Sequence, residues 1–298
     1  MSAGQREVSR GYEGFGGRVG LLGSESTPWW PPASRWADAA PNIVVVLLDD
    51  LGFSDFSPFG AEISTPAAEQ LAADGYLLTN YHTCPLCSPA RASLLTSLNP
   101  HRAGFGFVAN IDPGFPGFRM EIAPDVPTIA ETLREAGYAT FMVGKWHLTK
   151  EENLNDGADR SSWPVQRGFD CYYGCMDAFT PLLHPNRLVR DNTSLVIDEF
   201  PPDYYLTDDL TEQALRMLKG LRGNRRRRPF FLYFAHNAVH GPLQAKAAEL
   251  ARYRGRYDDG WEALRNRRFA SQVERGLFPP DLKIASASQH DLEALPEW

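Results

Sequence analysis

One short apolar run constrains the fold of this chain more than any other segment. After Asn42 the sequence reads Ile-Val-Val-Val-Leu-Leu, and two aspartates close the run. A run this short and rich in β-branched residues is typical of a strand buried on both faces, as in the centre of a parallel sheet. We therefore expect a strand at 43–48 with other layers packed on both of its sides.

Helix and strand patterns alternate along the rest of the chain. Helices are expected at 65–75, 87–96, 128–136 and 208–221. Strands are expected at 76–82, 138–143 and 230–235. Thr65 and Thr128 stand where N-caps belong, and the tail from Tyr253 is expected to be partly helical. This alternation predicts an α/β fold, in which helices flank both faces of a sheet.

The first forty residues differ from the rest. Residues 1–40 are rich in Gly, Ser and Pro, which predicts an N-terminal extension ahead of a folded region at 41–298. Within that region, Gly104 to Phe118 is rich in Gly, Phe and Pro and matches neither a helix nor a strand. Such a segment is usually a functional loop or a locally disordered stretch, and both interpretations stay open here.

Composition argues against several classes of protein. The 298 residues carry 37 acidic and 30 basic side chains, a net charge of −7, which disfavours binding to nucleic acid. The run Arg225 to Arg228 is expected to be a solvated turn. No apolar run approaches the roughly 20 residues of a membrane-spanning helix. The N-terminus lacks the apolar core of a secretory signal, so we expect a soluble cytoplasmic protein without membrane contact.

Asp49 and Asp50 are the first candidate functional residues. They follow the predicted strand at 43–48, and in open α/β sheets ligands bind at the carboxyl ends of strands. Two adjacent carboxylates repel each other unless a cation neutralises them, and hard divalent cations prefer oxygen ligands. A metal site competes here with a bland alternative, a capping or loop acid followed by a solvated one.

Cys87-Ser88-Pro89-Ala90-Arg91 is the most specific motif in the chain. If Cys87 begins a helix, the free N–H groups there favour an anion, and Arg91 lies on the same helical face. A free cysteine is more often a small buried apolar residue. Cys84 and Cys87 also form a C-x-x-C pair, which suits redox chemistry or a zinc site shared with Cys171 and Cys175. The wide separation and uneven spacing of the two pairs disfavour zinc.

Two further segments follow predicted strands. Lys145 and His147 stand two residues apart, so in an extended segment both side chains point the same way. A cation beside an imidazole suits an anionic substrate and proton transfer. His240 follows the strand at 230–235 and is a candidate acid, although a histidine near a strand end is more often simply a satisfied polar residue.

Taken in order, these motifs resemble the sulfatase family from about residue 41 onward. The resemblance rests on the strand ending in Asp49-Asp50, the Cys-x-Pro-x-Arg motif at 87–91, Gly-Lys-Trp-His-Leu at 144–148, Arg-Gly-Phe-Asp at 167–170 and Phe-Phe-Leu-Tyr-Phe-Ala at 230–235 with His240 and Pro242. It implies an alkaline-phosphatase-like mixed sheet with helices on both faces. It also implies hydrolysis of small-molecule sulfate esters of the arylsulfatase type.

The same resemblance implies a role for each site residue. A formylglycine-generating enzyme oxidises Cys87, and the hydrated formylglycine forms a covalent sulfo-enzyme intermediate. Ca²⁺ is held by Asp49, Asp50 and the modified residue 87. The remaining side chains act on the substrate: Arg91 steadies residue 87, Lys145 binds sulfate, His147 assists elimination and His240 protonates the leaving oxygen.

The end of the chain departs from the family pattern. In the family, a strand with an Asp-Asn pair follows the segment that carries His240 and completes the calcium site, and a second sulfate-binding lysine comes after it. The single Asp-Asn pair here, at 191–192, precedes His240. We therefore expect 41–298 to be the N-terminal part of the catalytic domain. Two alternatives remain, a phosphate or phosphonate ester hydrolase of the same fold and an inactive truncated chain.

Overall fold

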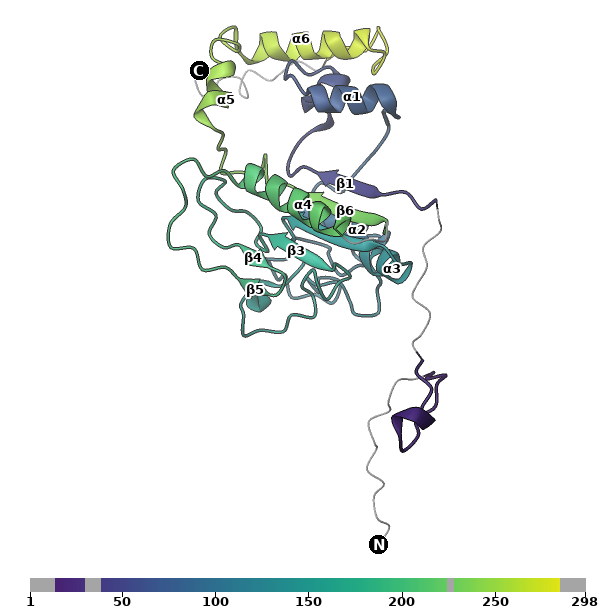
Figure 1. Cartoon of the computed structure of the whole chain (residues 1–298). Helices are drawn as coiled ribbons and strands as arrows, with labels where there is room; N and C mark the ends of the chain where they lie inside the picture. The colour runs from purple at the N-terminus through teal and green to yellow at the C-terminus, as the bar shows by residue number, and fades with distance from the viewer. Residues whose placement is uncertain (1–13, 30–38, 224–227, 285–298) are drawn as a thin grey trace.

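One mixed sheet organises the fold (Figure 1). The computed structural model describes residues 14–29, 39–223 and 228–284. The sheet has the order β1-β6-β2-β3-β4-β5; its first four strands are parallel, and β4 and β5 join as an antiparallel hairpin. The strands are β1 (Ile43–Leu47), β2 (Ala139–Gly144), β3 (Cys171–Gly174), β4 (Val189–Arg190), β5 (Thr193–Ser194) and β6 (Phe230–Ala235).

Apolar side chains cover both faces of the sheet. On one face, α2 (Cys87–Thr96) and α3 (Ile129–Glu135) contribute Leu95 and Ala130 to a core that contains Met142 and Phe231. On the other face, α4 (Leu206–Arg222) packs Leu210 against Phe141 and Leu232. The predicted α/β fold with helices on both faces is confirmed.

The two predicted N-caps differ. The Thr128 hydroxyl accepts a hydrogen bond from Glu131 N at 3.1 Å, and Glu131 accepts one from Thr128 N at 2.7 Å, so α3 begins with the predicted cap. Thr65 precedes α1 (Pro66–Asp74) but does not cap it with its side chain. Its hydroxyl lies 2.7 Å from Ser57 Oγ and accepts from Ser57 N instead, because the turn at 57–59 folds back onto it.

β1 is not buried on both faces, which corrects the first prediction. Val44 and Val46 are 50% and 56% exposed, whereas Val45 packs against the core. The reason is position: β1 is the last strand at its edge of the sheet, and α4 covers β2 and β3. The predicted strand at 76–82 is also wrong, because no described strand lies beside it to pair with, and Tyr76 and Tyr81 are exposed.

An apolar edge strand of this kind favours self-association. We expect Val46→Lys to move the purified chain toward monomer at high concentration, because a lysine on the edge opposes strand-to-strand pairing. Sedimentation velocity measures this. Val196→Lys is the matched control, since Val196 is also highly exposed but lies outside the sheet. Equal effects of the two lysines would exclude β1 as the associating surface.

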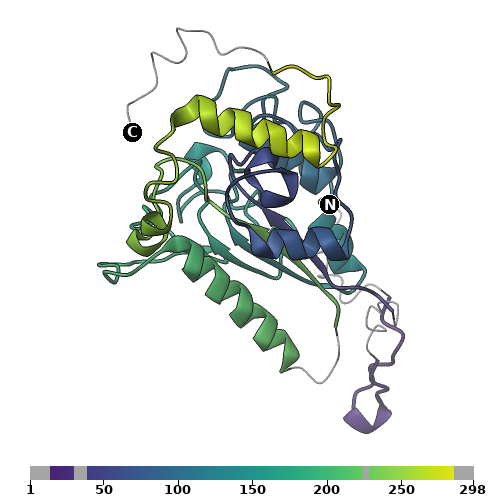
Figure 2. The same ribbon diagram turned by 90° about the horizontal axis from the view of Figure 1, so that it is seen from above.

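A second described helix lies alongside α1 on the far side of it from β1, as Figure 1 and Figure 2 together show. After α5 (Ala247–Arg252), α6 (Gly260–Glu274) runs beside α1, so the helical tail is confirmed. Arg268 on α6 binds Glu62 with nitrogen–oxygen distances of 2.9 to 3.0 Å and Asp55 at 2.6 Å. This pairing ties the tail to the segment between β1 and α1. Among the described helices, none is both long and apolar enough to cross a membrane.

Short helices and two partly described segments complete the chain. Of the predicted extension at 1–40, residues 14–29 form a small unit in which Phe15 packs edge to face on Trp29; residues 1–13 and 30–38 lie outside the described residues. Of the arginine run, Arg225 to Arg227 lie outside the described residues, and Arg228 donates to the carbonyl of Gly137. The single-turn 3-10 helices are η1 (Gly23–Glu25), η2 (Phe53–Asp55), η3 (Ser57–Phe59) and η4 (Glu151–Asn153).

Candidate active site

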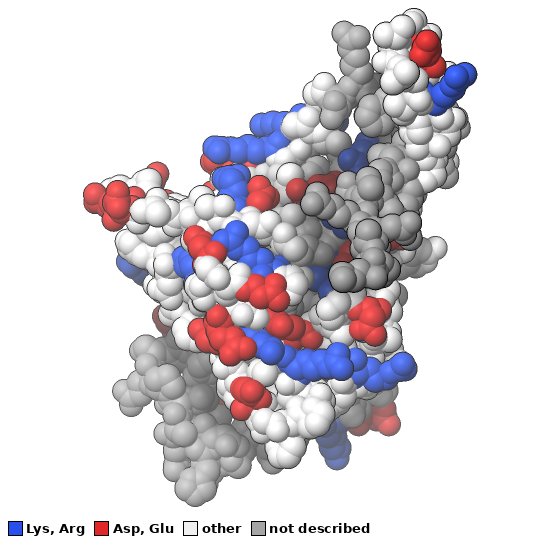
Figure 3. Space-filling model, turned by 90° about the horizontal axis from the view of Figure 1, so that it is seen from below, with Lys and Arg blue, Asp and Glu red and all other residues white. Residues whose placement is uncertain are grey.

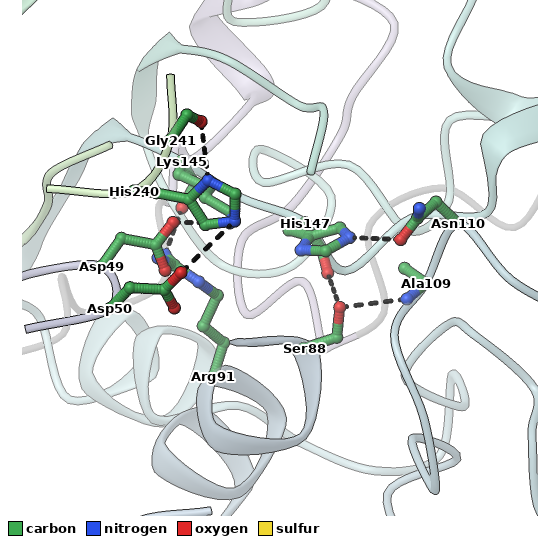
Figure 4. A network of polar contacts seen from close by, with 10 residues as sticks. All are labelled: Asp49, Asp50, Ser88, Arg91, Ala109, Asn110, Lys145, His147, His240 and Gly241. Carbon is green, nitrogen blue, oxygen red and sulfur yellow. Dashed lines mark hydrogen bonds and ion pairs between the residues drawn. The ribbon is translucent and has the colours of Figure 1, made fainter. Parts of the chain in front are cut away.

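The carboxyl ends of three parallel strands meet at one edge of the sheet. Leu47 of β1 and Gly144 of β2 both stand in register with Ala235 of β6, so the segments that follow them leave the sheet side by side. Together with the N-terminus of α2, these segments carry every catalytic or metal-binding residue predicted from the sequence. Figure 4 shows most of these side chains gathered there.

A buried carboxylate lies at the centre of this group. Asp49 Oδ2 is 2.6 Å from Lys145 Nζ, and Asp49 Oδ1 is 3.1 Å from Arg91 Nη2. All three side chains are at most 4% exposed. Arg91 Nη1 also donates to the Lys145 carbonyl at 2.7 Å, which ties α2 to the end of β2. Two cations thus share one anion in a site of low dielectric, leaving a surplus of positive charge.

Cys87 is the first residue of α2, as predicted, and its thiol is free and half-buried. The free N–H groups of that first helical turn favour an anion. The zinc alternative finds no support among the described residues, where no three His, Cys, Asp or Glu side chains are placed to hold a metal. Cys175 is buried, and burial strongly raises the pKa of its thiol, which keeps it protonated and unreactive.

Ser88 joins three segments at this helix end. Its hydroxyl donates to the His147 carbonyl at 2.8 Å and accepts from Ala109 N at 3.0 Å. The side chain is fully buried. Through this one hydroxyl, α2 holds both the segment after β2 and the irregular segment at 104–118, which is therefore an ordered loop beside the site.

Replacing Ser88 by alanine should lower the free energy of unfolding by about 1–3 kcal/mol, because it leaves a buried N–H and a buried carbonyl without partners. Urea denaturation followed by circular dichroism measures the loss. Ser93→Ala, on the same helix but with only a 3.9 Å contact to Cys84 Sγ, should change stability by less than about 0.5 kcal/mol. Similar losses for both variants would mean that the Ser88 hydroxyl does not hold these segments together.

His147 lies in the same group but not in the predicted conformation. Its φ of 53° is left-handed, so the prediction of an extended segment from Lys145 to His147 is wrong. Its Nε2 lies 3.0 Å from Asn110 Oδ1. Burial, and after it the charges of Lys145, Arg91 and His240, together lower the pKa of His147 to about 2, so the imidazole is neutral.

His240 stands at the more open side of the group. Its Nε2 lies 3.5 Å from Asp50 Oδ2, and its Nδ1 lies 2.8 Å from the Gly241 carbonyl, to which it donates as Nδ1–H. Phe179 stacks on the ring with a centroid distance of 5.9 Å and an interplanar angle of 2°. The Asp50 side chain is 59% exposed, so this half of the group faces solvent whereas Asp49 is buried.

Three residues of the site are not predicted from the sequence. They are Ser88, which joins α2 to the segment after β2, Asn110, which contacts His147, and Phe179, which stacks on His240. Ser88 stands at a variable position of the Cys-x-Pro-x-Arg motif. Asn110 belongs to a loop without periodicity. A polar residue in an ordered loop that faces a strand end is the signal that would have found Asn110.

Arrangement and charge together favour an anionic group. The surface drawn in Figure 3 interleaves acidic and basic side chains, so no broad field on that face attracts an anion. The attraction comes instead from two buried cations and a helix N-terminus, beside one neutral imidazole and one imidazole near solvent. Such a set of groups can bind a tetrahedral anion and move a proton.

Comparison with known proteins agrees with this chemistry. A sequence model of the Sulfatase family matches residues 41–291. A sulfatase of Schizosaccharomyces pombe is 34% identical over 81% of this chain and 45% of its own length, and an arylsulfatase of Klebsiella aerogenes is 31% identical over 87% of this chain and 54% of its own. The chain thus spans about half the length of the curated relatives it matches.

Solved structures show the same fold. The PsFucS1 sulfatase from Pseudoalteromonas sp. superposes with a TM-score of 0.54 over 80% of this chain and 50% of that one, at 21% identity. The mixed sheet flanked by helices is accordingly the alkaline-phosphatase-like fold of sulfatases, as predicted. By sequence, motif order and fold, the chain belongs to the sulfatase family.

Proposed function

We propose that the protein hydrolyses sulfate esters and that its activity is of the arylsulfatase type. The nucleophile is residue 87, after a formylglycine-generating enzyme has oxidised Cys87. One observation carries the proposal: Cys87 opens α2, and Arg91, one turn further along the same helix, shares a buried carboxylate with the buried Lys145. A sulfate ester carries the tetrahedral, anionic group that this site favours, and the Cys-x-Pro-x-Arg motif supports the oxidation.

Each side chain then has a role that follows from its environment. Hydrated formylglycine supplies two hydroxyls, of which one displaces the alcohol from sulfur and the other eliminates sulfate. Lys145 offsets the charge of the sulfate oxygens and Arg91 steadies residue 87, both from positions fixed by Asp49. His147 is neutral and serves as a base. His240 keeps Nδ1–H on the Gly241 carbonyl and, in its doubly protonated form, gives the Nε2 proton on the open side to the leaving oxygen.

Calcium fits this site in kind but not in number. Asp49 and Asp50 are hard oxygen donors at a strand end, which suits Ca²⁺, and they would hold it beside residue 87. Calcium takes 6–8 oxygen ligands. The described residues supply two carboxylates, and both oxygens of Asp49 already bind cations. A calcium ion held there would supply Lewis-acid polarisation of a sulfate oxygen. The described residues thus account for part of a calcium site.

The test is maturation followed by turnover. The full chain is co-expressed with a formylglycine-generating enzyme, and mass spectrometry of the peptide containing Cys87 looks for conversion of thiol to aldehyde. Turnover of 4-nitrophenyl sulfate is then measured with calcium present. We expect Cys87→Ala to lower turnover by roughly 10³-fold or more, the scale on which loss of a catalytic nucleophile acts.

Cys84→Ala is the matched control, because Cys84 lies three residues away and outside the motif. It should keep both the modification and the turnover. An unmodified thiol at position 87 despite an active maturation enzyme would overturn the mechanism. Faster turnover of 4-nitrophenyl phosphate than of the sulfate would make phosphate ester hydrolysis the main activity.

A further inference from the structure

The contact between Asn110 and His147 fixes more than the position of a ring. A neutral imidazole carries its proton on one nitrogen, and the partner of the other nitrogen decides which. Nε2 of His147 lies 3.0 Å from Asn110 Oδ1, an atom that can only accept. His147 Nδ1 is buried and has no hydrogen-bond partner among the described residues. In this arrangement Nε2 bears the hydrogen and Nδ1 bears the lone pair.

The opposite amide orientation would reverse this result, because the Asn110 NH₂ group would donate to Nε2 and move the proton to Nδ1. Electrostatics opposes that alternative. Figure 4 shows Nδ1 turned toward the side where Arg91, Lys145 and His240 lie. These neighbours disfavour positive charge on the ring. A lone pair facing cations is favourable, whereas an N–H pointing at them is not.

The backbone beside Asn110 is held in place by a hydrogen bond to Ser88. The neighbouring Ala109 donates to the buried Ser88 hydroxyl, and the same hydroxyl donates to the His147 carbonyl. The backbones of the loop and of His147 are therefore fixed to one atom, which keeps the amide opposite the ring. This bracket gives the contact the rigidity that tautomer selection requires.

We propose that Asn110 is a positioning residue that holds His147 as the Nε2–H tautomer, so that the Nδ1 lone pair faces the site. This assignment rests on the geometry of the chain itself; its catalytic meaning rests on the proposed function. In that function His147 is the base that receives the proton of a residue 87 hydroxyl as sulfate is eliminated. Only a ring with its lone pair turned inward can take that proton.

The test reads the tautomer directly and needs no activity. Ring nitrogen shifts and two-bond proton–nitrogen correlations of ¹⁵N-histidine-labelled full chain identify which nitrogen is protonated, with the His147 signal assigned from its loss in His147→Gln. We expect a protonated-type Nε2 shift and an unprotonated-type Nδ1 shift. Asn110→Leu removes the acceptor at similar volume and should give a mixture of the two tautomers.

Asn110→Asp separates the two amide orientations, because a carboxylate can only accept. At about pH 8, where it is ionised, it should retain the wild-type pattern. Asn155→Leu, a solvent-exposed control, should change nothing at His147.

An Nδ1–H pattern in the wild type would overturn the proposal, as would an unchanged tautomer in Asn110→Leu. If Asn110→Leu fails to fold, agreement or disagreement between wild type and Asn110→Asp still decides it. Because unmodified chain is used, a failure of sulfate hydrolysis leaves this result intact.

Discussion

Replacing Asp49 by asparagine is expected to lower the free energy of unfolding by about 3–5 kcal/mol, the range found when one partner of a buried ion pair is removed. Lys145 and Arg91 are 0% and 1% exposed, and Asp49 is the carboxylate that both contact. Asparagine keeps the shape but not the charge, so two buried cations are left without a counter-ion. Urea denaturation at neutral pH, followed by circular dichroism, measures the loss.

The adjacent aspartate is a built-in control. Asp50→Asn changes the same chemistry one residue further along, where the side chain is 59% exposed and its contact with His240 is 3.5 Å long. Its φ of 58° is left-handed, a conformation that asparagine tolerates well. We expect a change within about 0.5 kcal/mol. Equal losses for the two variants would show that the ion pairs of Asp49 do not stabilise the fold.

Sequence patterns predict this fold best where the signal lies inside the element. The apolar run at 230–235 coincides with β6, and Thr128 marks the start of α3. The failures depend on neighbours. The same kind of run forms β1, where Val44 and Val46 are exposed. A run of β-branched residues predicts a strand but does not distinguish a central strand from an edge strand. Residues 76–82 carry a strand pattern but have no described partner strand beside them.

The same distinction separates the site residues that the sequence predicts from those that it does not. Asp49, Lys145 and His240 each follow a strand, and the strand-end rule alone predicts that they meet. Asn110 reaches His147 from 37 positions away in the sequence, through a loop that no periodicity describes. Its place depends on the buried hydroxyl of Ser88, which only the folded chain brings between them. The mechanism proposed for Cys87 rests on its motif and on family membership, because physical reasoning about the residues alone does not predict that a cysteine is oxidised.

Gly144→Ala is expected to be at least as damaging to stability as Asp49→Asn, and it links the fold to the site. Gly144 ends β2, and the next residue is Lys145. The φ of Gly144 is +102°, and a Cβ added to this residue would lie 1.6 Å from the carbonyl oxygen of Ala235 in β6. That oxygen accepts the N–H of Lys145 at 2.8 Å, so the clash falls on the hydrogen bond that places this lysine. Neither partner is a flexible side chain.

Two costs add at Gly144, and a second glycine separates them. Gly114 has a φ of +78° and no atom within 4 Å of a Cβ, so Gly114→Ala measures the strain of a left-handed alanine alone, about 1–2 kcal/mol. The overlap with backbone comes in addition at Gly144, where we expect a total loss above about 4 kcal/mol, in the range reserved for severe packing faults. Urea denaturation compares the two variants, and failure of Gly144→Ala to show a cooperative transition is the extreme of the same outcome. If the stability loss of Gly144→Ala lies within about 1 kcal/mol of that of Gly114→Ala, β2 and β6 can move apart at this point. In that case the close packing of these two strands does not determine the buried ion pair between Lys145 and Asp49.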